Sequence, residues 1–261
     1  MALSLRFPEE ADFSSRVVGL DALDKDERPV SHAIFRVDKL IIGMPGGPER
    51  FVRELTTDWQ PVGTLVVSDD VMQPCTLARD SISACVIVSK YDIEDENAAG
   101  KNVLAVRLPV AIAPESTWVW VNALQQHIHA HEVFCLDAQM SSTMYDSPYP
   151  NEQFPLLRVL ATSGVSDENA LSEYPVRTLE VPRFTSGIPA ALLTLGELKA
   201  QRVRVVLTIC EFTTLPSEIV RCLLPLCPLL ALDRPLFFRP QKVTTPLGGK
   251  SEDDDYNGLY T

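Results

Sequence analysis

Three histidines alternate near the middle of the chain, in the segment QHIHAHE. If this segment is helical, His127 and His131 lie one turn apart and could hold a metal ion together with a third ligand. The helical metalloprotease pattern places Glu next to the first His, and Ile128 stands there instead. Imidazoles also suit the negative end of a helix dipole. We therefore expect His127, His129 and His131 at a helix end or on the surface, and we expect no metal site.

A glycine-rich turn, GMPGGPE, follows an apolar run that begins at Val37. Turns of this kind bind phosphate when their backbone amides point at the ligand. A P-loop needs Gly-Lys-Ser/Thr at the end of the turn, and Pro48-Glu49 stands there; the dinucleotide pattern G-x-G-x-x-G is also absent. We expect a tight strand-to-helix turn here rather than a phosphate site.

Asp137, Cys210 and Glu211 fall at the ends of expected strands, where α/β enzymes often place catalytic groups. Single acids at strand ends are also common without catalysis. The sequence contains no G-x-S-x-G, and it offers no matched set of acid, base and nucleophile. We therefore predict no catalytic residue, no cofactor and no enzymatic activity.

The last three residues carry a different kind of chemistry. Leu259, Tyr260 and Thr261 combine an apolar residue, a penultimate tyrosine and a free carboxylate. Burial of Leu259 and Tyr260 would contribute roughly 1.5–3 kcal/mol each, and the carboxylate can pair with Lys or Arg in a pocket. A PDZ ligand would need an apolar last residue, which Thr261 is not. We predict that this tripeptide inserts into a pocket of a partner protein.

The composition narrows the class of partner. The chain has 261 residues, of which 46% are hydrophobic and 22% charged, and its formal net charge is −12. Nucleic acid and anionic membranes are poor partners for such a protein, because they require clustered Lys and Arg; a basic protein surface is a better match. The six cysteines form no CxxC pair, which favours a reducing compartment. The N-terminus lacks the features of a secretory signal, and the longest apolar run, 222–232, is too short to span a bilayer.

The hydrophobic pattern predicts an α/β fold in which strands and helices alternate. The expected strands are 37–44, 62–68, 82–91, 103–112, 133–138, 176–181 and 203–212. The expected helices are 49–57, 115–131, 187–200 and 216–232. In the helix 115–131, Trp118, Val121, Leu124 and Ile128 are expected to share one apolar face. Residues 139–175, which contain the apolar patch 156–160, read as a long loop with one short helix.

Most of the expected strands are apolar throughout, which is typical of a sheet covered by helices on both faces. We therefore expect a three-layer sandwich with a mostly buried central sheet. Residues 1–35 are expected to form a flexible N-terminal arm, residues 36–238 the α/β domain, and residues 239–261 a flexible acidic tail that ends in the tripeptide.

Four segments together resemble one family. They are the run KLIIGM, the patch LLRVL at 156–160, the segment SGIPAALLTLGELKAQRVRVVLTICEFTTL, and the terminal Leu259-Tyr260-Thr261. In this order they resemble the proteasome assembly chaperone 1 family, whose tail ends in a hydrophobic-Tyr-X motif. The resemblance covers about 37–261. The acidic segments 92–97 and 252–255 have no counterpart in it.

The resemblance implies a nucleoside-phosphorylase-like sandwich without its active site. It also implies a non-enzymatic chaperone that forms a heterodimer with a second, similar chaperone and binds the α-subunit ring of the immature proteasome core particle. The tail would enter a pocket between two α subunits, where Tyr260 packs and the Thr261 carboxylate meets a lysine. Occupation of this pocket would promote ring assembly and block premature binding of activators. The expected location is the cytoplasm, with the nucleus as a second compartment.

Two other classes of function remain open at this point. One is a nucleoside-phosphorylase-like or hydrolase enzyme on the same sandwich, which would need a phosphate- or ribose-binding set. The other is a binding protein whose tail is read by a different partner. Amidation of the C-terminus separates pocket insertion from this last possibility, because insertion depends on the free carboxylate, whereas a phosphotyrosine reader would not need it.

Overall fold

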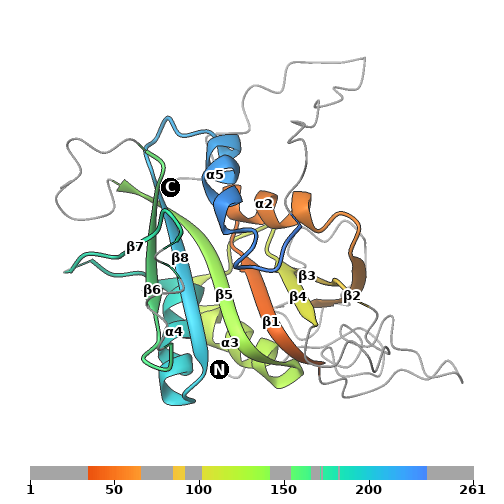
Figure 1. The fold of residues 1–261 in the computed structure, drawn as a ribbon. Helices are drawn as coiled ribbons and strands as arrows, with labels where there is room; N and C mark the ends of the chain where they lie inside the picture. The colour runs from red at the N-terminus through yellow and green to blue at the C-terminus, as the bar shows by residue number, and fades with distance from the viewer. Residues whose placement is uncertain are drawn as a thin grey trace, which may run out of the picture.

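The computed structural model describes residues 35–65, 85–91, 102–141, 154–165, 171, 173–181 and 183–233. Eight strands form one sheet, and helices cover both of its faces (Figure 1). The predicted α/β sandwich with a mostly buried central sheet is therefore confirmed. The expected arm and tail lie outside the described residues, apart from Phe35.

The elements follow one another as strand, helix and strand for most of the chain. In chain order they are β1 (Phe35–Gly43), α2 (Gly47–Leu55), β2 (Gln60–Leu65), β3 (Cys85–Ser89), β4 (Val103–Arg107), the 3₁₀ turn η2 (Pro114–Ser116), α3 (Thr117–His127), β5 (Ile128–Met140), β6 (Leu156–Ala161), β7 (Arg177–Thr178), α4 (Gly187–Leu198), β8 (Arg202–Cys210), α5 (Pro216–Leu223) and the 3₁₀ turn η5 (Leu224–Leu226).

The strand order in the sheet is β2-β3-β4-β1-β5-β8-β6-β7. The four central strands β4, β1, β5 and β8 are mutually parallel, and β2 and β3 pair antiparallel with their neighbours. At the other edge, β6 is antiparallel to β8 and parallel to β7. Gly43 at the end of β1 is in register with Arg107 of β4 and Leu136 of β5. The carboxyl ends of the central strands therefore meet along one border of the sheet, which we call the carboxyl edge.

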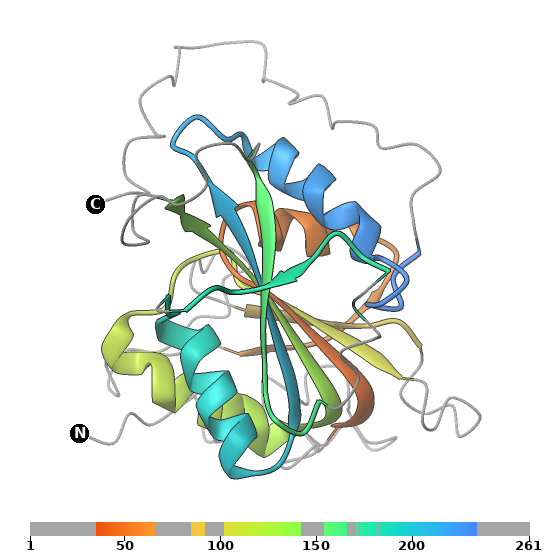
Figure 2. The same cartoon turned by 60° about the vertical axis from the view of Figure 1, so that its left-hand side comes forward.

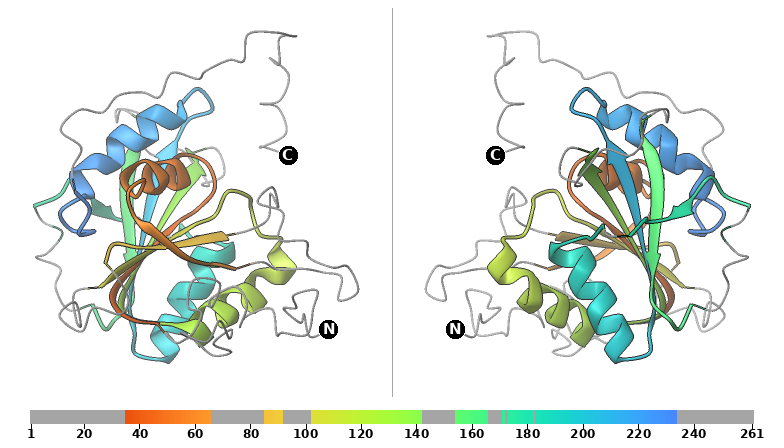
Figure 3. Two further views of the ribbon diagram at one scale, coloured as in Figure 1. Left: turned by 90° about the vertical axis from the view of Figure 1, so that its right-hand side faces the viewer. Right: turned by 90° about the vertical axis from the view of Figure 1, so that its left-hand side faces the viewer.

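The two faces of the sheet are covered by different helices (Figure 3). Leu40 and Ile42 of β1 belong to the core beneath α3 and α4, while Ile41 between them belongs to the core beneath α2 and α5. Successive residues of a strand point to opposite faces. A central strand that is buried on both faces must therefore be apolar throughout, as β1 is in this segment.

Several expectations about secondary structure are wrong. The expected helix 216–232 is α-helical only as far as Leu223, and the expected strand 103–112 ends at Arg107. The patch 156–160 forms strand β6, which pairs antiparallel with β8, for example Leu157 with Thr208. Leucine-rich segments also favour helix, and here strand pairing overrides that local preference. The expected helix 115–131 ends at His127, because Ile128 begins β5 in register with Phe35 of β1.

The net charge is unevenly distributed along the chain. Acidic and basic residues are equal in number among the described residues, so the net charge of −12 comes from the segments outside them. Any long-range attraction to a basic partner therefore depends on those segments.

Among the helices that the structure describes, none has the length and apolar character needed to cross a membrane.

Candidate partner-binding surface

The three histidines do not lie on one helical face. His127 is the last residue of α3 and is buried, whereas His129 and His131 are exposed on β5. The nearest acidic partner of His131 is Asp38, with Nδ1 4.0 Å from Oδ1. Within the described parts of the chain, no group of three His, Cys, Asp or Glu side chains could hold a metal ion.

The glycine-rich segment forms a closed turn between β1 and α2. The amide of Glu49 donates to the carbonyl of Met44 at 2.8 Å, and the amide of Arg50 donates to Gly46 at 3.0 Å. Gly46 has φ +92°, a left-handed conformation that favours glycine. A Cβ on Gly47 would stand 2.6 Å from Ile219 of α5. The turn is therefore packed against α5, as the expected tight connection, and these two amides are used within it.

Asp137 and Cys210 lie on the neighbouring strands β5 and β8 near the carboxyl edge. Cys210 ends β8 as expected, whereas β5 continues past Asp137 to Met140. Burial raises the pKa of Asp137 to about 6, against hydrogen bonds from the Ala138 amide and Gln139 that lower it. Burial raises the pKa of the Cys210 thiol to about 12, so this thiol is protonated at neutral pH and is a poor nucleophile. Glu211 is exposed. Its amide donates to the hydroxyl of Thr214 at 2.9 Å, which shapes the loop after β8.

Asp137 has a positioning role that the sequence did not indicate. Its carboxylate accepts a hydrogen bond from Nε2 of Gln139 at 3.3 Å, and the same Nε2 donates to the hydroxyl of Thr185 at 2.9 Å. Thr185 lies just before α4. The network therefore ties the segment that leads into α4 to the end of β5.

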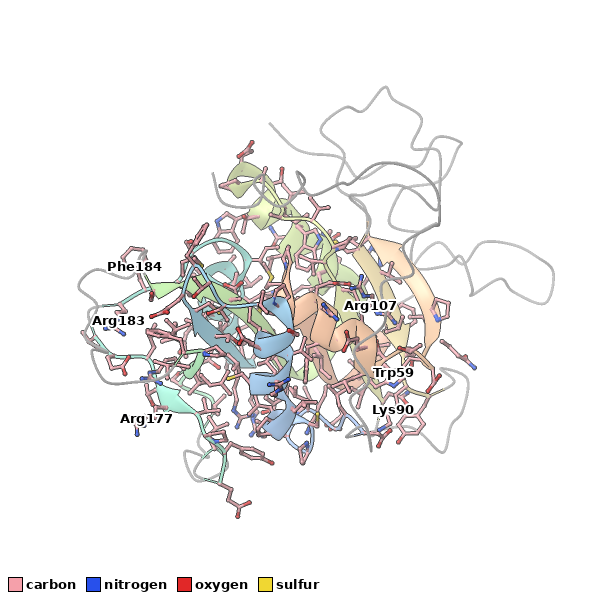
Figure 4. All side chains as sticks on the ribbon, turned by 90° about the horizontal axis from the view of Figure 1, so that it is seen from above. Trp59, Lys90, Arg107, Arg177, Arg183 and Phe184 are labelled. Carbon is pink, nitrogen blue, oxygen red and sulfur yellow. The ribbon has the colours of Figure 1, made fainter. Side chains whose placement is uncertain are left out.

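Large apolar side chains are exposed on the loops at this end of the molecule. Phe184 is 75% exposed and follows Arg183, which pairs with Glu180 at 3.2 Å (Figure 4). Phe212 and Leu215, in the loop after β8, are 78% and 60% exposed. Exposed aromatic residues of this kind are enriched in protein–protein contacts. These exposed side chains make the carboxyl edge a candidate surface for protein contact.

Sequence reasoning missed these apolar residues. Phe184 and Phe212 lie in short loops between predicted elements, and a single aromatic residue in a loop can equally well fold back onto the core. Only the path of the two loops shows that the rings point away from it.

The segment after α5 is fixed to the sheet by two lysines. Nζ of Lys39 on β1 donates to the carbonyl of Leu229 at 2.7 Å, and Nζ of Lys90 donates to that of Ala231 at 2.9 Å. Lys90 also pairs with Asp233 at 3.1 Å. Lysines placed at a helix C-terminus satisfy its free carbonyls and oppose its dipole. These contacts hold the chain against the sheet as far as Asp233.

The backbone at this point adopts a helix-ending motif. Ala231 has φ +56°, the amide of Leu232 donates to Cys227 at 2.9 Å, and the amide of Ala231 donates to Pro228 at 3.2 Å. This is the Schellman pattern, with Ala231 in the left-handed position that glycine usually takes. The predicted site residues Leu259, Tyr260 and Thr261 lie beyond it, outside the described residues.

Comparisons with known proteins identify the fold. No protein-family model matches the sequence, and no curated protein matches it. The structure is similar to that of PbaB, an archaeal proteasome activator of Pyrococcus furiosus, with 15% identity, a TM-score of 0.53, and coverage of 79% of this chain and 87% of PbaB.

Two further solved structures are similar at the same level. A Thermoplasma acidophilum protein of unknown function has 12% identity and a TM-score of 0.52, over 77% of this chain and 79% of that protein. PbaA of Pyrococcus furiosus, an archaeal homolog of proteasome-assembly chaperone, has 16% identity and a TM-score of 0.50, over 77% of this chain and 81% of PbaA. At these identities the likeness establishes the fold, which this chain shares with PbaA and PbaB.

Proposed function

We propose that this chain is a non-enzymatic proteasome assembly chaperone. It pairs with a second, similar chaperone, binds the α-subunit ring of the immature core particle, and inserts its C-terminal tripeptide into a pocket between two α subunits. Through this contact it promotes ring assembly and blocks premature binding of activators, in the cytoplasm and the nucleus. The observation that carries the proposal is the sequence Leu259-Tyr260-Thr261 on a chain that shares its fold with an archaeal proteasome activator.

The anchored start of the tail supports this proposal physically. Lys39 and Lys90 hold the chain up to Asp233 against the sheet. If residues 234–261 behave as a flexible coil, their ends are on the order of 30 Å apart, at about 5–6 Å times the square root of the number of residues. A tripeptide tethered to a docked domain has a raised effective concentration near its pocket, so weak binding of the tripeptide itself suffices.

The experiment measures binding of the full chain to purified proteasome core particles by biolayer interferometry. Deletion of residues 259–261 or the substitution Tyr260→Ala is expected to weaken binding at least tenfold, because each removes buried apolar area or the carboxylate. Tyr256→Ala, which changes a tyrosine of the same tail outside the tripeptide, is the matched control. Equal binding by all four proteins would overturn the proposed role of the tripeptide.

The acidic run Glu252 to Asp255 lies close to the tripeptide in sequence. We propose that it steers the tail toward a basic rim around the pocket. Asp253→Lys combined with Asp254→Lys should then slow association most at low salt, since screening removes the attraction at high salt. Association rates that do not depend on salt would contradict this part of the proposal.

A further inference from the structure

The segment after α5 crosses the sheet in the direction of the edge strand β2. It lies on the same side of the sheet as α2 and α5 (Figure 2). The carbonyl of Leu229 contacts Lys39 of β1, and the carbonyl of Ala231 contacts Lys90, just after β3. The strand order here is β1-β4-β3-β2. The contacts of the chain therefore shift from β1 to the residue after β3, and β2 is the next strand in this direction.

An exposed apolar corner lies at the start of β2. The first residue of β2 pairs with the last residue of β3, so Trp59 and Lys90 are neighbours just beyond these two ends (Figure 4). Trp59 is half-buried and packs against the core beneath α2 and α5. Pro61 is exposed, and Tyr91 is 43% exposed with its ring centroid 6.0 Å from Nζ of Lys90. We call Trp59, Pro61 and Tyr91 the β2 corner. It lies beside the point where the chain reaches Asp233.

The residues that follow Asp233 are strongly apolar. After two residues comes the run Leu-Phe-Phe at 236–238. Three consecutive large apolar side chains gain free energy when they leave water, and such runs are avoided on solvent-exposed surfaces. Pro235 and Pro240 stand on either side of the run, and the residue before a proline favours an extended backbone. The run is therefore suited to lie extended on an apolar surface.

The distances allow the run to reach the β2 corner. Oδ2 of Asp233 is 3.1 Å from Nζ of Lys90, which fixes the starting point. Neighbouring strands lie about 4.7–4.9 Å apart. Three to five extended residues span roughly 10–18 Å, which exceeds that spacing. The run can therefore contact Trp59 while the pair between Asp233 and Lys90 stays in place.

Two other segments that continue from β2 and β3 are less suited to the corner. Residues 92–101 continue from Tyr91, but they contain four acids and only one large apolar residue, Ile93. Acids would lose their hydration against the aromatic rings, which is costly. Residues 66–84 continue from the far end of β2, at the carboxyl edge, because β2 runs in the same direction as β4. The run 236–238 therefore fits the corner better than either segment.

We propose that the run 236–238 folds back onto the β2 corner of its own chain, with Trp59 as the central contact. The contacts of Lys39 and Lys90 bring the run to the corner, and the docked run extends the cover of this side of the sheet to its edge. If residues 239–261 behave as a flexible coil, they then reach about 25 Å from the corner. The inference does not rest on the proteasome proposal, because it concerns contacts within one chain.

The first test is limited proteolysis of the full chain with chymotrypsin, with initial rates at each bond measured by mass spectrometry. Phe237 is a cleavage site within the run, and Tyr256 is the matched control site in the same tail. A synthetic peptide of residues 230–261 gives the intrinsic rates at both sites. After this correction, cleavage after Phe237 should be at least 30-fold slower than cleavage after Tyr256, because a docked segment must be released before it is cut.

Substitutions in the corner locate the contact. Trp59→Ala should speed cleavage after Phe237 at least tenfold and leave cleavage after Tyr256 unchanged. Trp59→Phe, which keeps an aromatic ring, should retain most of the protection. The control variant is Trp118→Ala, which removes an exposed tryptophan from α3 and should change neither rate.

The second test is reciprocal and leaves the described residues unchanged, so it does not depend on how well a Trp59 variant folds. Hydroxyl-radical footprinting measures the exposure of single tryptophans in the full chain. Leu236→Ser combined with Phe238→Ser should raise oxidation of Trp59 at least threefold and leave that of Trp118 unchanged. Leu247→Ser, which changes an apolar residue of the same tail outside the run, should change neither.

Three outcomes would overturn the proposal. Equal corrected rates after Phe237 and Tyr256 would show that the run is not docked. Protection that survives Trp59→Ala would place the run elsewhere on the molecule. Protection that disappears on dilution, at a constant ratio of protease to protein, would make the occupant of the corner a segment of a second copy. Deletion of residues 259–261 should change none of these results, so they are separate from those of the proteasome-binding experiment.

Discussion

The two helical layers each cover a buried core but present opposite kinds of surface. Phe51 of α2 and Trp120 of α3 are both fully buried, each beneath its own layer. On the outside, α2 carries the ion pair Arg50–Glu54 at 2.7 Å, and α5 exposes Glu218 and Arg221. By contrast, α3 contains no Asp, Glu, Lys or Arg, and α4 contains only Glu197.

This difference shows that the two sides of a helix have separate roles. The buried side holds the helix on the sheet, and the composition of the outer side indicates whether it faces solvent or a partner. An amphipathic helix with a charged outer side has no further apolar surface to bury once its apolar side covers the sheet. A helix that is apolar or uncharged on both sides gains further free energy from a second contact. The first kind of surface is suited to solvent and the second to a partner.

The largest expected effect tests whether the cores beneath the two helical layers contribute equally to the stability of the fold. Phe51→Ala and Trp120→Ala should each lower the free energy of unfolding by about 3–5 kcal/mol, because each removes a fully buried aromatic ring and leaves a cavity. Urea denaturation measures both. A loss of less than about 1 kcal/mol for one variant would show that its layer packs loosely, and the comparison would fail.

The second effect concerns the acids beneath the layers. Glu49 of α2 has a pKa raised by burial, and Arg53 and Arg107 offset this change. Asp137 lies toward the other layer, where its pKa is raised to about 6 and only hydrogen bonds oppose burial. A carboxyl whose pKa is higher in the folded state binds more protons there, so its contribution to stability is present below pH 3.8 and is lost as pH rises through 6.

The expected loss from Asp137 between pH 4 and pH 7 is up to about 3 kcal/mol. Asp137→Asn should remove this part of the pH dependence, and Glu49→Gln should change it less, because two arginines already compensate the charge of Glu49. The measurement is urea denaturation at pH 4.5 and pH 7.5. If the two variants reduce the pH dependence of stability equally, the neighbouring arginines do not make Glu49 behave differently from Asp137.

The third effect uses one close approach in each layer. A Cβ on Gly47 would stand 2.6 Å from Ile219, and a Cβ on Gly196 would stand 2.5 Å from Val203. Each glycine-to-alanine substitution should lower stability by about 1–3 kcal/mol, since the neighbouring side chain must move. Gly196→Ala should cost less than Gly47→Ala, because alanine within helix α4 regains about 1 kcal/mol of helix propensity. Thermal unfolding measures which variant is less stable. A variant that is more stable than the original protein would show that the neighbouring side chain moves aside at little cost.

The smallest effect is on the charged surface itself. A double-mutant cycle on Arg50 and Glu54 should give a coupling free energy of about 0.3–0.5 kcal/mol, since the pair is partly exposed and four residues apart on α2. A coupling above about 1 kcal/mol would mean that the outer side of α2 contributes to folding as more than a solvent-facing surface.

Much of the fold could be predicted from the sequence, because buried parallel strands leave a simple signal. The runs around Ile41, Val205 and Phe134 are apolar on both faces and were assigned to strands. The strand at Leu157 was missed, because its neighbour Arg158 is charged and the leucines also suit a helix. Arg158 is nonetheless buried, and it pairs with Glu180 at 2.9 Å, a contact between residues far apart in the sequence.

The candidate site was only partly predictable. The sequence placed Cys210 at a strand end correctly, since β8 stops there, but β5 continues past Asp137 to Met140. It did not reveal the link from Asp137 through Gln139 to Thr185, nor the exposure of Phe184. Both depend on how distant loops meet at the carboxyl edge.

The sequence by itself determined the class of the fold, the order of most of its elements and the chemistry of the terminal tripeptide, because periodicity, turn residues and side-chain types are local properties. The tertiary structure decided that the helix before β5 stops at His127, that Trp118 faces outward, and that Lys39 and Lys90 fix the chain as far as Asp233. Each of these depends on which distant segments pair in the sheet. Strand pairing and lysine-to-carbonyl bonds join residues far apart in sequence, so no local pattern specifies them.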